Sequence, residues 1–61
     1  MNRIKERRKE LRMTQEELAE KANVSRQTIF SLETGKQENA TLETMLSIAK
    51  ALDSTVDVIF L

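Results

Sequence analysis

Apolar residues recur at helical spacing along the first half of the chain. Near the N-terminus, Ile4 and Leu11 share one stripe of a helix expected from about residue 3 to residue 12. Arg8 falls on the same stripe, where an apolar residue would be usual. A second helix begins after Thr14, and its inner face is expected to be Leu18, Ala19 and Ala22. The pattern therefore predicts two short helices in succession.

Local signals mark the ends of the second helix. Thr14 and Glu17 have the spacing of a capping box, in which a hydroxyl and a carboxylate each bind an amide at the helix start. Asn23 follows the helix and tolerates the left-handed backbone conformation that a sharp exit requires. We expect Val24 to fill the corner that follows.

A third helix is expected from Ser25, its N-terminal cap, to about Thr34. Ile29 and Leu32 are its inner positions, and Gly35 suits the left-handed residue that ends many helices. Opposite the inner face lie side chains that are mostly polar: Gln27, Phe30, Ser31 and Thr34. Two short helices joined by a tight turn, the second polar on its outer side, are typical of a helix-turn-helix motif that places one helix in the DNA major groove.

Thr41 is expected to cap a fourth helix, whose apolar period is carried by Leu42, Met45, Leu46, Ala49 and Leu52. The tail from residue 53 to residue 61 has two interpretations. Val56, Ile59 and Phe60 would suit a short fifth helix. The alternation of Val56, Val58 and Phe60 among β-branched residues favours a strand instead.

We favour the strand in this tail. A lone strand leaves its backbone amides unpaired, and the same strand from a second molecule would pair with them across a two-fold axis. Val56, Val58 and Phe60 are then the predicted dimer contact. The fold class is all-α: a four- to five-helix repressor-like helix-turn-helix domain over residues 1–61, with a C-terminal strand as the possible addition.

Composition excludes several function classes. The chain has no histidine, no cysteine, no proline and one glycine. Histidine acid-base chemistry, thiolate metal sites, disulfides and a glycine-rich phosphate loop are therefore ruled out, and we expect neither an enzyme nor a cofactor or metal site. No segment approaches the about 18 apolar residues of a membrane span, and no apolar signal region opens the chain. These features predict a cytoplasmic protein with no membrane partner.

The net charge is zero, but it is unevenly distributed. Residues 1–26 carry eight Lys/Arg and five Asp/Glu, a balance of +3, whereas residues 27–61 carry two and five, a balance of −3. A molecule polarised in this way can present a basic face to phosphates. The alternative for any single lysine or arginine is that it simply solvates its helix.

An ordered set of residues extends nearly to Leu52: Arg8-x-x-Leu11-Arg12, Thr14-Gln15-x-x-Leu18-Ala19, Val24-Ser25, Ile29, Leu32-Glu33-x-Gly35-Lys36, and Thr41-Leu42-x-Thr44 through Ile48-Ala49-x-Ala51-Leu52. With these spacings the chain resembles the Cro/phage-repressor helix-turn-helix family, often called XRE-type. Asn23 stands where that family usually has glycine, and Asp53-Ser54-Thr55 replaces the frequent Gly-Val-Ser before a fifth helix. The tail is more similar to antitoxin-type members, in which a terminal strand pairs between subunits.

The third helix carries the candidate base-reading residues. Gln27 projects from its first turn and can bind adenine through N6 and N7, and it matches a base-contacting position of the family. Arg26 can take guanine O6 and N7, or a phosphate. Phe30 can pack on a thymine methyl or on neighbouring side chains, and Ser31 can reach a base only where the helix lies close.

The resemblance also implies contacts to the DNA backbone, from Gln15, Ser25, Thr34 and Lys36. Helix N-termini favour phosphate, which agrees with the place of Gln15. Arg8 and Glu33 both border the expected core, and the family has an ion pair between these positions. We therefore expect Arg8 and Glu33 to form a structural pair, because burying either charge alone is costly.

The function expected from these features is a sequence-specific DNA-binding transcriptional regulator, with repression as its expected mode. One helix reads only a few base pairs, so we expect a homodimer on a palindromic operator with half-sites about 34 Å apart. The alternative is an antitoxin, which binds a toxin protein and regulates its own operon.

Overall fold

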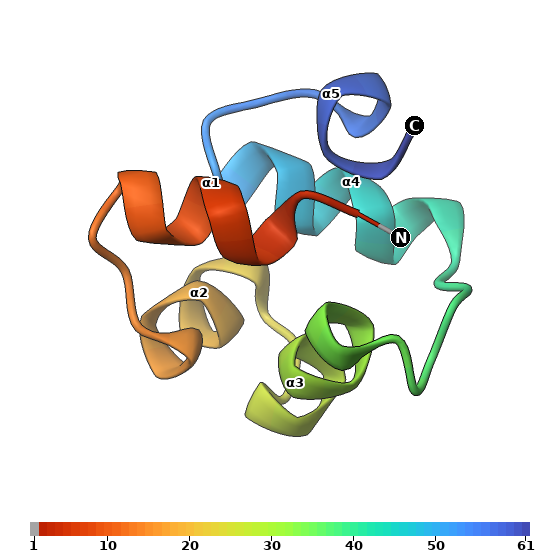
Figure 1. Cartoon of the computed structure of the whole chain (residues 1–61), viewed down its shortest axis with the longest axis horizontal. Helices are drawn as coiled ribbons and strands as arrows, with labels where there is room; N and C mark the ends of the chain where they lie inside the picture. Colours follow the sequence, from red (N-terminus) through yellow and green to blue (C-terminus); the bar gives the residue numbers. More distant parts are fainter. Residues whose placement is uncertain (1) are drawn as a thin grey trace.

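Along residues 2–61, five helices follow one another around a small shared core (Figure 1). The computed structural model describes residues 2–61. In chain order its helices are α1 (Ile4–Glu10), α2 (Gln15–Ala22), α3 (Arg26–Thr34), α4 (Leu42–Ala51) and α5 (Val56–Phe60). Residues 2–61 contain no strand. The predicted all-α class is therefore confirmed.

The helices pack in a simple arrangement. Figure 1 shows α1 crossing in front of α4, with α5 on one side of this pair and α2 and α3 on the other. α2 packs against both α3 and α4, α5 packs against α4, and α1 contacts α3 and α5. α2 and α3 are neighbours in sequence and in space, so the connection between them is a tight turn rather than a crossover.

Within the described part of the chain, the buried residues are all apolar and come from every helix. They are Ile4, Leu18, Ala19, Ala22, Ile29, Leu32, Ile48, Ala49, Leu52 and Ile59. The predicted inner faces of α2 and α3 are confirmed by this set. Burying one large aliphatic side chain contributes roughly 1.5–3 kcal/mol. A core this small leaves the domain dependent on its caps and polar contacts as well.

The predicted helix ends are present. The Thr14 hydroxyl accepts the Glu17 amide at 3.0 Å, and the Glu17 carboxylate accepts the Thr14 amide at 2.8 Å, which completes the capping box. Asn23 has φ 57° and Gly35 has φ 82°, both left-handed. Thr41 caps α4 through the Thr44 amide. Arg12 and Asp53 are also left-handed, and this turns the chain after α1 and α4.

The expected inner face of α4 is wrong in part. Leu42 and Leu46 are 62% and 53% exposed, whereas Ile48 is fully buried beside Ala49 and Leu52. Apolar residues lie on more than one side of this helix, so its period alone does not select the buried side. The choice is made by packing against α2 and α5.

The predicted C-terminal strand is wrong as well, because residues 56–60 form α5. In the helix, Val56 and Phe60 lie one turn apart, and both pack against the core. Ile59 is buried, whereas Val58 is 49% exposed. Val56, Val58 and Phe60 therefore do not share a face, and they do not form an intersubunit sheet. The Arg3 amide also donates to the Ile59 carbonyl at 2.8 Å, which holds α5 to the N-terminal segment. Burial outweighs β-propensity, a preference that spans only about 1 kcal/mol.

Candidate functional site

The turn between α2 and α3 fixes the position of α3. Asn23 ends α2 in the left-handed conformation, and the Val24 amide donates to the Ala19 carbonyl at 3.0 Å. Ser25 then caps α3 by accepting the Thr28 amide at 3.0 Å. Ile29 and Leu32 anchor the inner side of α3 in the core. A short helix held at both its start and its inner face presents its outer side rigidly.

The outer side of α3 collects the predicted base-reading residues. Arg26 and Gln27 are exposed in its first turn. Phe30 is 42% exposed, and Ser31 is half-buried. Gln27, Ser31 and Thr34 lie one turn apart along the helix and so share a face. The arrangement is an open row of hydrogen-bonding groups with one aromatic ring beside it.

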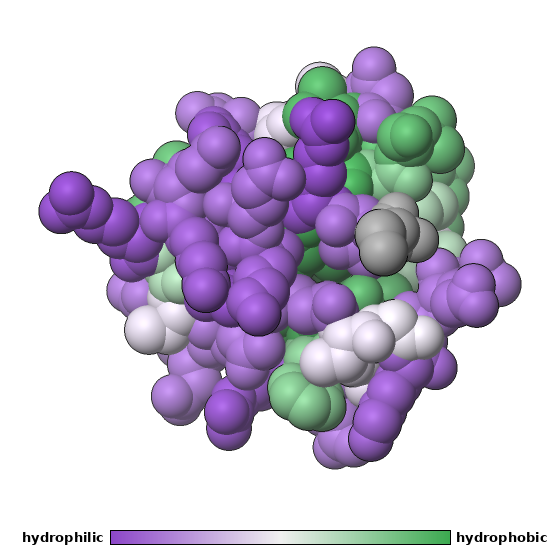
Figure 2. Space-filling model, viewed as in Figure 1, coloured by the Kyte–Doolittle hydropathy of each residue, from purple (hydrophilic) through white to green (hydrophobic). Residues whose placement is uncertain are grey.

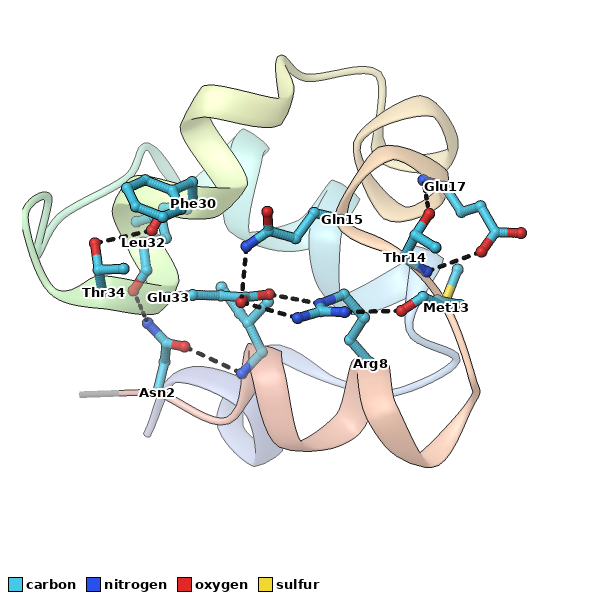
Figure 3. Close-up of polar contacts among 11 residues, drawn as sticks. Asn2, Arg8, Met13, Thr14, Gln15, Glu17, Phe30, Leu32, Glu33 and Thr34 are labelled. Carbon is cyan, nitrogen blue, oxygen red and sulfur yellow. Dashed lines mark hydrogen bonds and ion pairs between the residues drawn. The ribbon is translucent and has the colours of Figure 1, made fainter.

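Behind this row, the predicted ion pair links α1 to α3 (Figure 3). Arg8 Nε donates to Glu33 Oε2 at 2.7 Å, and Arg8 Nη2 donates to Glu33 Oε1 at 3.1 Å. Arg8 Nη1 also donates to the Met13 carbonyl at 2.8 Å. The side chains are 11% and 3% exposed. The hydrogen bond to the Glu33 carboxylate raises the pKa of Arg8.

Gln15 joins this network from the start of α2. Its Nε2 donates to Glu33 Oε1 at 3.1 Å, and Figure 3 shows the amide pointing toward the carboxylate. An amide nitrogen carries two protons, so one remains for another acceptor. Glu33 thus orients a side chain at the N-terminus of α2, a place where phosphate is favoured.

The other residues predicted to bind the DNA backbone differ in the hydrogen bonds that they already make within the protein. The Thr34 hydroxyl donates to the Phe30 carbonyl at 2.9 Å, within its own helix. The Ser25 hydroxyl shares a 2.9 Å hydrogen bond with Thr28 Oγ1 while it caps α3. Lys36 is exposed just beyond the end of α3. Lys36 and Gln15 therefore offer protons more readily than the two hydroxyls do.

Two contacts that hold the site were not foreseen. Asn2 accepts the Ile4 amide at 3.0 Å and donates to the Leu32 carbonyl at 2.9 Å, which ties the N-terminal segment to α3. Its place just before α1 was a signal for a capping residue. Arg7 donates to the Leu52 carbonyl at 3.0 Å across the fold, and no local pattern announces that contact.

The described residues also limit other chemistry. Across residues 2–61, no cluster of histidine, cysteine, aspartate or glutamate could hold a metal ion. In the same span, every helix is too short or too polar to cross a membrane.

Comparisons with known proteins agree with this geometry. A family model described as helix-turn-helix matches residues 4–59. A protein of Archaeoglobus fulgidus, named an uncharacterized HTH-type transcriptional regulator, is 44% identical over 59 residues, which cover 97% of this chain and 82% of that protein. A protein of the same description from Methanothermobacter thermautotrophicus is 64% identical over 33 residues. That match covers 54% of this chain and about half of the relative, 48%.

A solved structure gives the same result for the fold. The N-terminal DNA-binding domain of SinR from Bacillus subtilis superposes with a TM-score of 0.85 at 36% identity, covering 90% of this chain and 80% of that one. The chain belongs to the Cro/phage-repressor (XRE-type) helix-turn-helix family.

Proposed function

We propose that this protein is a sequence-specific DNA-binding regulator of transcription that inserts α3 into the major groove. The observation that carries the proposal is the exposed outer row of α3, which is fixed by the turn after Asn23 and the Ser25 cap. The similar SinR domain is described as DNA-binding, which supports the same use of this surface. The major groove admits an α-helix and displays a distinct pattern for each base pair.

The residues that contact bases lie in the first two turns of α3. Gln27 can bind adenine through two hydrogen bonds, and Arg26 can do the same with guanine or bind a phosphate. Phe30 offers its exposed ring to a thymine methyl, and Ser31 contributes where the helix lies closest. Each good bidentate contact discriminates by about 1–3 kcal/mol.

Contacts to the DNA backbone would set the register of α3. Gln15 can donate its second amide proton to a phosphate beside the start of α2. Lys36 can reach a phosphate beyond the end of α3. The Thr34 hydroxyl would have to exchange its hydrogen bond to the Phe30 carbonyl for a phosphate contact, and the Ser25 hydroxyl already caps α3, so we expect smaller contributions from both.

The active form is a homodimer on a palindromic operator. A single helix reads only a few base pairs, whereas two copies related by a two-fold axis read two half-sites about 34 Å apart. Occupancy of such an operator would repress transcription, and the cytoplasm is the location expected for this role. The relatives are named as transcriptional regulators, which favours this function over an antitoxin.

Selection of bound sequences from random duplexes, at a stated salt concentration, tests the proposal. The expected result is an inverted repeat whose half-sites lie about one helical turn apart. Recovery of unrelated sequences, bound with the same affinity as random DNA, would reject sequence-specific recognition.

A further inference from the structure

One side of α4 exposes leucines in a place that the proposed DNA contact does not use. The four exposed residues of this helix are Leu42, Glu43, Leu46 and Lys50, here called the α4 patch. Leu42 and Leu46 are one helical turn apart, and both are more than half exposed. Figure 2 shows apolar side chains gathered on the molecule where α4 begins and α5 ends. Large exposed leucines at helical spacing are typical of a contact with another macromolecule.

The charges of the α4 patch indicate what covers it. DNA is an unsuitable partner here, because the patch includes the exposed carboxylate of Glu43 and belongs to neither α2 nor α3. Glu43 and Lys50 stand near opposite ends of α4, on the same side as the leucines. When two such helices lie antiparallel across a two-fold axis, each glutamate comes opposite the lysine of the other helix. The α4 patch is therefore complementary to itself.

We infer that the α4 patch is the contact between two copies of this chain, with α4 packed antiparallel on its counterpart. Leu46 lies at the two-fold axis, and Glu43 faces Lys50 of the partner subunit. This inference rests on the homodimer proposed above and names its surface. None of the patch residues belongs to α2 or α3, so α3 of each subunit stays free to contact DNA.

The two exposed leucines of each copy indicate a dimer of modest strength. Contiguous exposed apolar patches larger than a few hundred Å² mark interaction sites, and a standard interface covers about 800 Å² on each partner. Two leucines per copy form only the centre of such an interface. The paired charges at its rim select the antiparallel orientation more than they add affinity.

Sedimentation equilibrium of the full chain tests the leucine contact. Leu46→Glu places a charge at the two-fold axis and should weaken self-association at least about tenfold, because a buried unpaired charge is strongly unfavourable. Leu11→Glu is the matched control, since Leu11 is 37% exposed at the end of α1 and outside the α4 patch. It should leave the association constant unchanged. Circular dichroism melts verify that both variants fold.

A charge exchange tests the orientation independently. Glu43→Lys and Lys50→Glu should each associate poorly with themselves, because both rim pairs become like-charged. An equimolar mixture of the two variants should form a heterodimer of wild-type strength, since each substituted side chain again meets an opposite charge. Loss of association that the mixture does not repair would overturn the antiparallel arrangement.

The DNA experiment distinguishes failure of this inference from failure of the proposed function. Dimeric Leu46→Glu protein that binds the selected palindrome like wild type would overturn the α4 contact and leave sequence recognition standing. The expected Leu46→Glu protein is instead monomeric, binds the palindrome at least about tenfold more weakly, and binds a single half-site as wild type does. Wild-type protein that recognises no sequence would refute the proposed function, whatever its oligomeric state.

Discussion

Removing either member of the Arg8–Glu33 pair should strongly destabilise the domain. Two hydrogen bonds join the side chains, which are 11% and 3% exposed. Each charged group is therefore stabilised by its partner, because little water reaches it. Breaking a buried pair by removing one partner typically costs 3–5 kcal/mol, and about 3 kcal/mol is the better figure for Arg8, which keeps some exposure. A domain of this length has a free energy of unfolding of roughly 3–9 kcal/mol. Arg8→Ala or Glu33→Ala should therefore lose a third or more of it.

Thermal and urea unfolding followed by circular dichroism measures this loss. A cost of about 3 kcal/mol corresponds to a fall in Tm of at least about 12 °C for a domain of this size. Glu10→Ala is the matched control, because its pair with Arg7 at 3.2 Å is exposed and should be worth less than about 1 kcal/mol. Replacing both partners, as in Arg8→Met with Glu33→Leu, should recover much of the stability. Single variants that melt like Glu10→Ala would show that the Arg8–Glu33 pair does not stabilise the fold.

Two further predictions concern charge. Lys36→Ala should weaken binding to all DNA sequences and reduce the slope of log affinity against log salt concentration by about 1. Lys21→Ala is the control and should leave that slope unchanged. An unaltered slope for Lys36→Ala contradicts the phosphate contact. Hydrogen bonds from the Thr14 amide and hydroxyl lower the pKa of Glu17, so its stabilising effect is present at neutral pH and is lost as the pH falls through that lowered pKa. The stability difference between wild type and Glu17→Gln should stay constant at neutral pH and shrink only as the pH falls below about 4.3, the ordinary pKa of a glutamate; a difference that stays constant in acid excludes the linkage.

Features fixed by neighbouring residues could be predicted from the sequence. The capping box at Thr14 and the left-handed Asn23 depend on a few adjacent positions, and both are present. The Arg8–Glu33 pair joins distant segments, and it was expected because both charges bordered the core and the family has the pair.

Features decided by tertiary packing could not be predicted in this way. Leu42, Leu46 and Ile48 are equally suited to burial, and only contact with α2 and α5 selects Ile48. The tail has β-branched residues that favour a strand locally, but burial of Ile59 on α4 and α1 makes it a helix. The Arg7 contact with the Leu52 carbonyl depends on the packed fold and has no local signature.

The Gln27→Ala variant shows whether α3 reads bases. The measurement is the affinity of wild type and variant for the selected site, for each single-base change within a half-site, and for random duplex, all at one salt concentration. The expected result is a loss of about 1–3 kcal/mol on the selected site, relaxed preference at one position in each half-site, and unchanged binding to random DNA. Equal losses on selected and random DNA, with the base preferences intact, would contradict base reading by α3.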